Sequence, residues 1–81
     1  MATRRITATR EWQQITDGHE TVVIQFTDPV EICDNAVKPD IHMPALYFKG
    51  QTLTISPPTH AWIRSAGSGI YNEIPVVVMD M

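Results

Sequence analysis

The side chains of this sequence that could do chemistry are spread along the chain without a shared spacing. Its three histidines lie at positions 19, 42 and 60, and none has the i, i+4 spacing of a helical metal site. Asp40 and His42 would point to the same face of a strand, but they lie between prolines, and a metal centre needs at least a third ligand. The sequence therefore predicts no metal site and no cofactor.

The candidate nucleophiles also lack a catalytic context. Ser68 lies in the run Ala-Gly-Ser-Gly, without the strand–turn–helix surroundings of a nucleophile elbow. Cys33 is the only cysteine, so it forms no disulfide within the chain, and its alternating surroundings favour an inward-facing core residue over a reactive thiolate. We predict that the protein is not an enzyme, although its composition permits a hydrolase or metal enzyme that uses His42 or His60.

Length and composition indicate one small globular domain. The chain has 81 residues, of which 43% are hydrophobic and 19% charged, values typical of a folded protein rather than a disordered one. Its longest aliphatic run, Val76 to Met79, is far shorter than the roughly 20 residues that span a bilayer. We expect no membrane association and no secretory signal. A domain of this size often gains stability by associating with other chains.

Positive charge is concentrated at the start of the chain. Arg4, Arg5 and Arg10 lie in the first ten residues, which contain no acidic residue, whereas the rest of the chain holds three basic residues against nine acidic ones. This asymmetry predicts an extended basic arm over residues 1–10 that docks on a neighbouring copy, an acidic protein lattice or nucleic acid. Nucleic acid is the least expected partner, because no basic stripe continues into residues 11–81. The alternative is a solvated, frayed segment.

The hydrophobic pattern of residues 11–81 predicts strands. Val22, Ile24 and Phe26 recur at period two among β-branched residues, and no window of 11 residues shows a convincing helical period. Similar short segments follow at spacings near ten residues, which is typical of a small antiparallel β-sandwich or barrel. We predict a single all-β, jelly-roll-like domain of about six to seven strands, with a loop at 34–44. The expected strands cover 12–15, 20–27, 30–33, 45–48, 51–56, 60–65 and 70–80, and the alternative for residues 9–16 is one or two helical turns.

The last of these strands is hydrophobic on both faces. Val76, Val77, Val78 and Met79 are apolar at successive positions, whereas a strand in a two-layer sandwich normally wets one face. We therefore expect one face to pack in the core and the other against a second subunit. The alternative is that the N-terminal arm of the same chain covers it. The predicted oligomer and partner interface comprises Arg4, Arg5, Arg10, Trp12, Val76, Val77, Val78 and Met79.

Aromatic residues suggest a second surface. Trp62 and Arg64 share one face of their strand by alternation, so Trp62 is a candidate for a partly exposed anchor with a guanidinium over its ring. Together with Tyr47 or Tyr71 it could stack on a sugar. The alternative is a tryptophan that closes one end of the core. The predicted ligand surface is Tyr47, Trp62, Arg64 and Tyr71.

Several short motifs occur in a familiar order. They are Trp12-x-x-Ile15-x-Asp17-Gly18, Val-Ile-Gln25-Phe-Thr27, Gly50-x-x-Leu-Thr-Ile-Ser-Pro57, Ala61-Trp62-Ile-Arg64-Ser65-x-Gly67 and a valine-rich end. In this order the chain resembles small all-β virion proteins of tailed bacteriophages over most of residues 11–79. The resemblance implies a small β-sandwich, frequently trimeric, that decorates or cements a capsid or forms part of a collar, fibre or baseplate. It implies no catalytic residue.

The resemblance also suggests where the chain meets its partners. Arg4, Arg5 and Arg10 would belong to an arm that reaches across the capsid surface, and the strand that ends at Met79 would lie between copies. We predict a virion protein, made in the host cytoplasm, that binds the major capsid protein or another virion protein as a homo-oligomer, with a trimer favoured. The alternative is a tail, fibre or baseplate appendage that binds host glycan through the aromatic surface.

Overall fold

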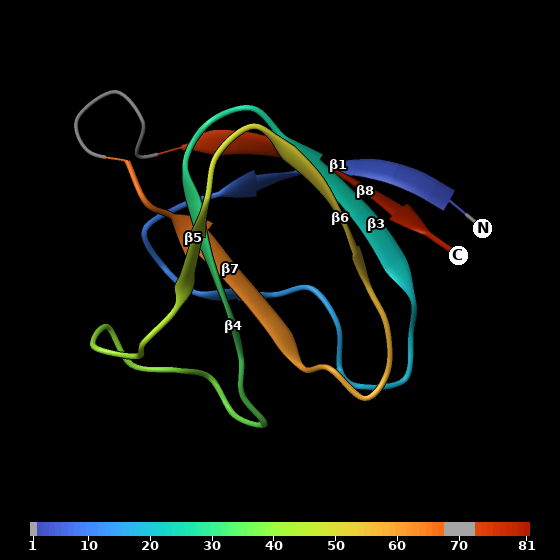
Figure 1. Cartoon of the computed structure of the whole chain (residues 1–81), viewed down its shortest axis with the longest axis horizontal. Helices are drawn as coiled ribbons and strands as arrows, with labels where there is room; N and C mark the ends of the chain where they lie inside the picture. Colours follow the sequence, from blue (N-terminus) through green and yellow to red (C-terminus); the bar gives the residue numbers. More distant parts are fainter. Residues whose placement is uncertain (1, 68–72) are drawn as a thin grey trace.

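The chain folds into β-strands joined by turns and loops (Figure 1). The computed structural model describes residues 2–67 and 73–81, and no helix occurs among them. The strands are β1 (Ala2–Ala8), β2 (Gln13–Gln14), β3 (Val22–Phe26), β4 (Val30–Asp34), β5 (Leu46–Phe48), β6 (Gln51–Ile55), β7 (Ala61–Ser65) and β8 (Ile74–Asp80). The expectation of an all-β chain is confirmed.

The strands form two antiparallel sheets of four strands each. Sheet A has the order β1-β8-β3-β6, and sheet B has the order β2-β7-β4-β5. Strands pair from the two ends of the chain inward, β1 with β8, β2 with β7, β3 with β6 and β4 with β5. The chain therefore behaves as one long hairpin whose tip is the segment between β4 and β5, as Figure 1 allows the reader to follow. Further pairing of β8 with β3 and of β7 with β4 completes the sheets.

Alternation along the strands builds a single hydrophobic core. In β3, Val22, Ile24 and Phe26 are buried, as their spacing predicts, and they pack with Val76 and Val78 of β8. Sheet B adds buried residues of its own to the same cluster, among them Val30, Ile32 and Ile63. Period-two burial on both sheets thus gives one core shared between them.

Strand β8 accommodates Pro75 because the neighbouring ladder with β3 ends before this residue. The Met81 amide donates to the Thr21 carbonyl at 3.0 Å, so alternation along the antiparallel ladder directs the backbone groups of odd-numbered β8 residues toward β3. The pairing of β3 with β8 stops at Val77. Pro75 therefore lies beyond the end of this ladder, and its missing N–H costs no hydrogen bond to β3.

The structure has one strand more than the predicted segments. Residues 2–8, which the sequence analysis assigned to an arm, form β1 and pair with β8 from Ala2↔Asp80 to Ala8↔Ile74. The two arginines in this segment obscured its strand pattern, and the stabilising partner is a strand some 70 residues further along the chain. The expected turn at 66–69 and the start of the strand at 70–80 fall partly on residues 68–72, outside the described part of the chain.

Candidate interaction surface

The predicted interface divides into buried and accessible members. Val76 and Val78 lie fully in the protein's own core, and Trp12 is also buried. Val77 and Met79 are half-buried on the outer face of sheet A, where Arg5 lies opposite Val77 and Thr3 lies opposite Met79. The two faces of β8 therefore differ: one packs in the core, and the other is flanked by side chains of β1 and β3.

The basic residues of the first ten positions do not act as one group. Arg4 forms an ion pair with Asp80 at the end of the β1–β8 ladder, and both side chains are partly exposed. Arg5 projects from the opposite face of β1. Arg10 lies beyond β1, beside Glu31 and Arg64 of sheet B. Positive charge is thus spread over both sheets rather than along one extended stretch.

On the outer face of sheet B, Arg64 is the centre of a polar cluster. Its Nε donates to Glu31 Oε1 at 2.7 Å, and its guanidinium carbon lies 4.3 Å from the ring centroid of Trp12. Its Nη1 donates to the Ile41 carbonyl at 3.1 Å. The Arg64 side chain is only 15% exposed, so the charge is largely removed from water and is balanced by Glu31. The sequence suggested that a guanidinium covers Trp62, and this was wrong: Arg64 covers Trp12.

Three side-chain N–H groups hold the segment 35–41 over sheet B. Besides Arg64, Trp12 Nε1 donates to the Asp40 carbonyl and Trp62 Nε1 donates to the Asn35 carbonyl, both at 2.9 Å. These bonds satisfy carbonyls in a segment that has no strand neighbour to do so. We call this arrangement the 35–41 latch. Sequence reasoning missed it, because spacing along the chain does not show which carbonyl an indole N–H will reach.

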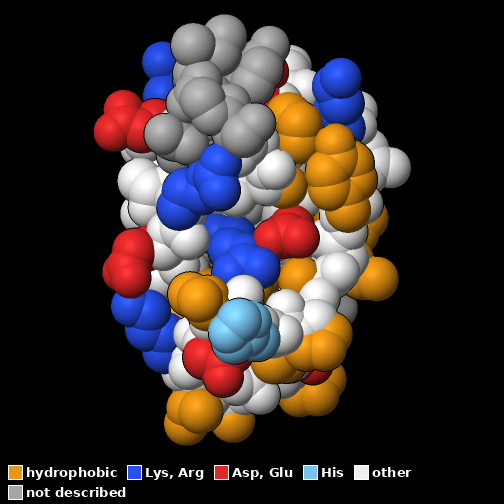
Figure 2. Space-filling view, turned by 90° about the vertical axis from the view of Figure 1, so that its left-hand side faces the viewer, with side chains coloured by type: hydrophobic (Ala, Val, Ile, Leu, Met, Phe, Trp, Pro, Cys, Tyr) orange, Lys and Arg blue, Asp and Glu red, His pale blue; other side chains and the backbone are white. Residues whose placement is uncertain are grey.

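The predicted aromatic surface is partly assembled. Trp62 and Arg64 share the outer face of sheet B, as alternation predicts, and Tyr47 lies in the same row as Glu31 and Arg64. Tyr47 is 60% exposed, whereas Trp62 is half-buried, with its N–H bonded to Asn35. Tyr71 lies outside the described residues. Figure 2 shows one face of the molecule on which acidic and basic side chains lie among hydrophobic ones.

Large hydrophobic side chains are exposed along the hairpin tip. Ile41 is 72% exposed and Leu46 is 68% exposed, and Val37 and Tyr47 are exposed as well. All four lie between residues 37 and 47, and we call them the tip residues. For Val37 and Ile41 the signal was present in the sequence, since apolar residues are unusual in a proline-containing loop, which is normally polar. Leu46 and Tyr47 belong to β5. The loop was correctly placed, but its exposed apolar content was not recognised as a surface.

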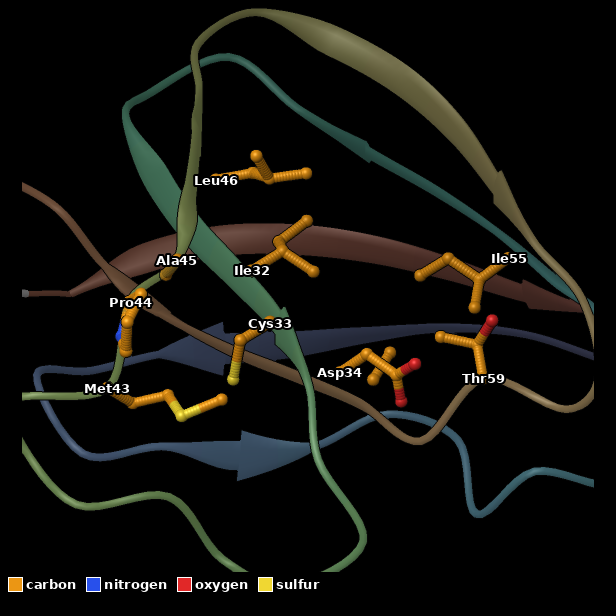
Figure 3. A pocket seen from close by; sticks show the side chains of 10 residues that line it. Ile32, Cys33, Asp34, Met43, Pro44, Ala45, Leu46, Ile55 and Thr59 are labelled. Carbon is orange, nitrogen blue, oxygen red and sulfur yellow. The ribbon is translucent and has the colours of Figure 1, made fainter.

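A mainly apolar pocket of about 400 Å³ opens beside the tip residues. Figure 3 shows Ile32 and Leu46 lining it from sheet B, with Ile55 and Thr59 from the end of β6 and the loop that follows. The pocket exists because β5 pairs with β4 only as far as Ile32↔Leu46, which leaves the end of β4 without a neighbour on that side. Its volume falls in the range of ligand sites, so it can take an apolar group.

Cys33 and Asp34 border this pocket without forming a reactive centre. Burial raises the pKa of the Cys33 thiol, so the thiol is neutral at physiological pH. Asp34 Oδ1 accepts a hydrogen bond from the His60 backbone N–H at 2.9 Å. Cys33 is buried, as expected, but it pairs with Trp62 on the outer face of sheet B rather than pointing inward, because Ile32 takes the core-facing position of β4.

Asp40 and His42, which the sequence analysis considered and did not assign as a metal pair, form a local hydrogen bond instead. The His42 backbone N–H donates to Asp40 Oδ1 at 2.8 Å, which closes a turn at the hairpin tip. Among residues 2–67 and 73–81, no three His, Cys, Asp or Glu side chains gather closely enough to hold a metal ion. In the same residues, no helix is long and apolar enough to cross a membrane.

Comparisons of the chain with protein-family models, with curated proteins and with solved structures each return no match.

Proposed function

We propose that this protein is a structural component of a bacteriophage virion, which decorates or stabilises the capsid surface as a homo-oligomer. The single observation that carries the proposal is the exposure of the tip residues. Ile41, Leu46 and Tyr47 are large hydrophobic side chains that a solitary small protein gains nothing by presenting to water. Aromatic and aliphatic side chains beside a pocket are typical anchors of protein–protein contacts.

The proposed fold is a jelly-roll sandwich. The strand orders of sheets A and B are those expected when a long antiparallel hairpin is wound around a common core. Jelly rolls occur in viral capsid and lectin domains, which agrees with the resemblance of the sequence to phage virion proteins. A fold alone does not determine a function, so the tip residues and not the topology carry the argument.

The proposed action is mechanical. Each bound copy would bury the tip residues against the shell, and binding to the assembled shell alone would stabilise that state by mass action. Positive charge on the protein would add long-range attraction to an acidic shell, and this part of the affinity would decrease with salt. No chemical step is involved.

Co-sedimentation with shells built from the major capsid protein of the same genome tests the proposal. We expect the protein to saturate the shells at a fixed number of copies. The double variant Ile41→Ser/Tyr47→Ser should bind at least tenfold more weakly, because it removes two anchors from an exposed segment. Thr3→Ser, a small change on sheet A, should bind normally. Shells that take up no wild-type protein would refute the assignment.

The alternative role, a tail or fibre module that binds host glycan, has one observation in its favour. Tyr47 is exposed in the same row as Glu31 and Arg64, so an aromatic ring lies beside charged groups. Trp62 and Arg64 already donate to Asn35, Glu31 and Ile41, which leaves Tyr47 as the main stacking candidate. Retention on a glycan array that is lost in Tyr47→Ala, without shell binding, would favour this role.

A further inference from the structure

We propose that strand β6 pairs with β6 of a second copy about a twofold axis, so that two copies of sheet A form one continuous eight-stranded sheet. The inference rests on the proposed function only in that both require self-association. The partner is a second copy of this chain.

The first step concerns the unused backbone groups of β6. Within the described part of the chain it is an edge strand of sheet A, paired with β3 on one side alone. The hydrogen bond from Met81 to Thr21 fixes the alternation in β3, so Val22, Ile24 and Phe26 direct their backbone groups toward β6. The groups of Thr52 and Thr54 then point away from β3. They form a free edge that can accept another strand.

The β6 edge also lacks charged side chains. No ionised side chain occurs from Gly50 to Thr59, whereas the other edge of sheet A, β1, carries Arg4 and Arg5. Pairing β1 with a second β1 would bring like charges together, which blunts that edge. The protein has a formal net charge of −3, so two copies repel each other in general. The uncharged β6 edge is therefore where two copies can approach at least electrostatic cost.

The third step is a self-complementary register. With the twofold axis at Leu53, Thr52 of one copy lies opposite the partner's Thr54, and both residues direct their backbone groups to the shared edge. This gives two hydrogen-bonded pairs, while Leu53 meets the partner's Leu53 on the core side. Threonine pairs and leucine pairs across antiparallel strands are each favourable. Lys49 would lie opposite the partner's Pro57, so no like charges meet.

The apolar pocket opens next to the same edge of β6. Ile55, the last residue of β6, lines the pocket together with Leu46 and Ile32. In the proposed register the partner's Gln51 lies next to Ile55 at this edge of the molecule, and the partner's β5–β6 hairpin follows. One contact would therefore cover both features that the isolated chain leaves open on this side: an unpaired strand and an apolar opening of about 400 Å³.

A pair of double variants tests both the contact and its register. In Thr52→Lys/Thr54→Glu each lysine would face a glutamate of the partner, whereas in Thr52→Lys/Thr54→Lys lysine would face lysine. Both variants change the same two exposed positions and lose the same hydrogen bond from Gln25 to Thr52. Lys/Lys also lowers the net negative charge, which by itself would favour association, so a monomeric Lys/Lys variant must reflect the contact at these two positions. Light scattering after gel filtration would give the mass, and circular dichroism would check the fold.

We expect wild type and the Lys/Glu variant to have twice the mass of one chain, and the Lys/Lys variant to be a folded monomer, with dimerisation weakened at least tenfold. The melting temperature should rise with concentration only for the two dimers. A monomeric wild type, a trimer as the resemblance implies, or two variants of equal mass would overturn the pairing. Shell binding is measured separately: a dimer that binds no shell refutes the virion role alone, and a monomer that binds shells refutes the pairing alone.

Discussion

The outer faces of the two sheets differ in their side chains and in what lies over them. Sheet A presents a plainer surface, in which Val77 and Met79 are half-buried beside Arg5 and Thr3 of β1. Sheet B carries Trp12, Trp62 and Arg64, and the 35–41 latch lies over them. The difference shows how a long irregular segment can be held without a strand partner, since side-chain donors replace the ladder.

Among the changes that compare the two outer faces, loss of Arg64 should lower the free energy of unfolding most. Arg64→Ala removes the ion pair, the contact with Trp12 and the bond to Ile41, and it leaves Glu31 partly buried without its partner. We expect the free energy of unfolding to fall by about 2–4 kcal/mol. Arg5→Ala, on the plain face of sheet A, should change it by less than about 0.5 kcal/mol. Urea denaturation measures both, and equal losses would contradict the contrast between the faces.

Threonine substitutions on the two faces of β8 should differ in their cost to stability, by less than the loss of Arg64. Val78→Thr places a hydroxyl in the fully buried core, and we expect a loss of about 1–3 kcal/mol. Val77→Thr makes the same chemical change on the half-buried outer face, where water and the neighbouring Gln25 can satisfy the hydroxyl. It should cost less than about 0.5 kcal/mol by the same denaturation measurement. A comparable loss at Val77 would mean that the outer face of sheet A is also covered in solution.

The smallest effect should come from Cys33, which lies on the covered face. Burial raises the pKa of this thiol in the folded state, so the fold favours the protonated form. The associated stability is fully present below the unfolded pKa of about 8.5 and decreases as pH rises through the higher folded value. Between pH 8 and 10, wild type should therefore lose more stability than Cys33→Ala, as measured by denaturation at each pH. Parallel curves would show that the thiol is open to water.

Local rules predicted the strands well and the surfaces poorly. Period-two alternation located β3, β4, β6 and β7, because their buried side chains are contiguous in sequence. It did not locate β1, whose arginines break the hydrophobic pattern and whose partner lies at the other end of the chain. Nor did it show that Arg64 covers Trp12 or that the pocket opens beyond β5, since both depend on which strands become neighbours. The run of valines predicted that one face of β8 packs in the core, and Val76 and Val78 do so, whereas its prediction of a second subunit on the other face stays a prediction.

Alternation along β8 divides its backbone hydrogen bonds between two neighbouring strands, and this bears on the N-terminal residues. The amides of Ile74, Val76 and Val78 depend on β1, whereas those of Val77 and Met79 belong to the β3 ladder. If β1 peels away, every second amide of β8 is released to exchange with solvent while the others stay protected. If β1 paired with a neighbouring molecule instead, β8 would therefore still be held by its hydrogen bonds to β3.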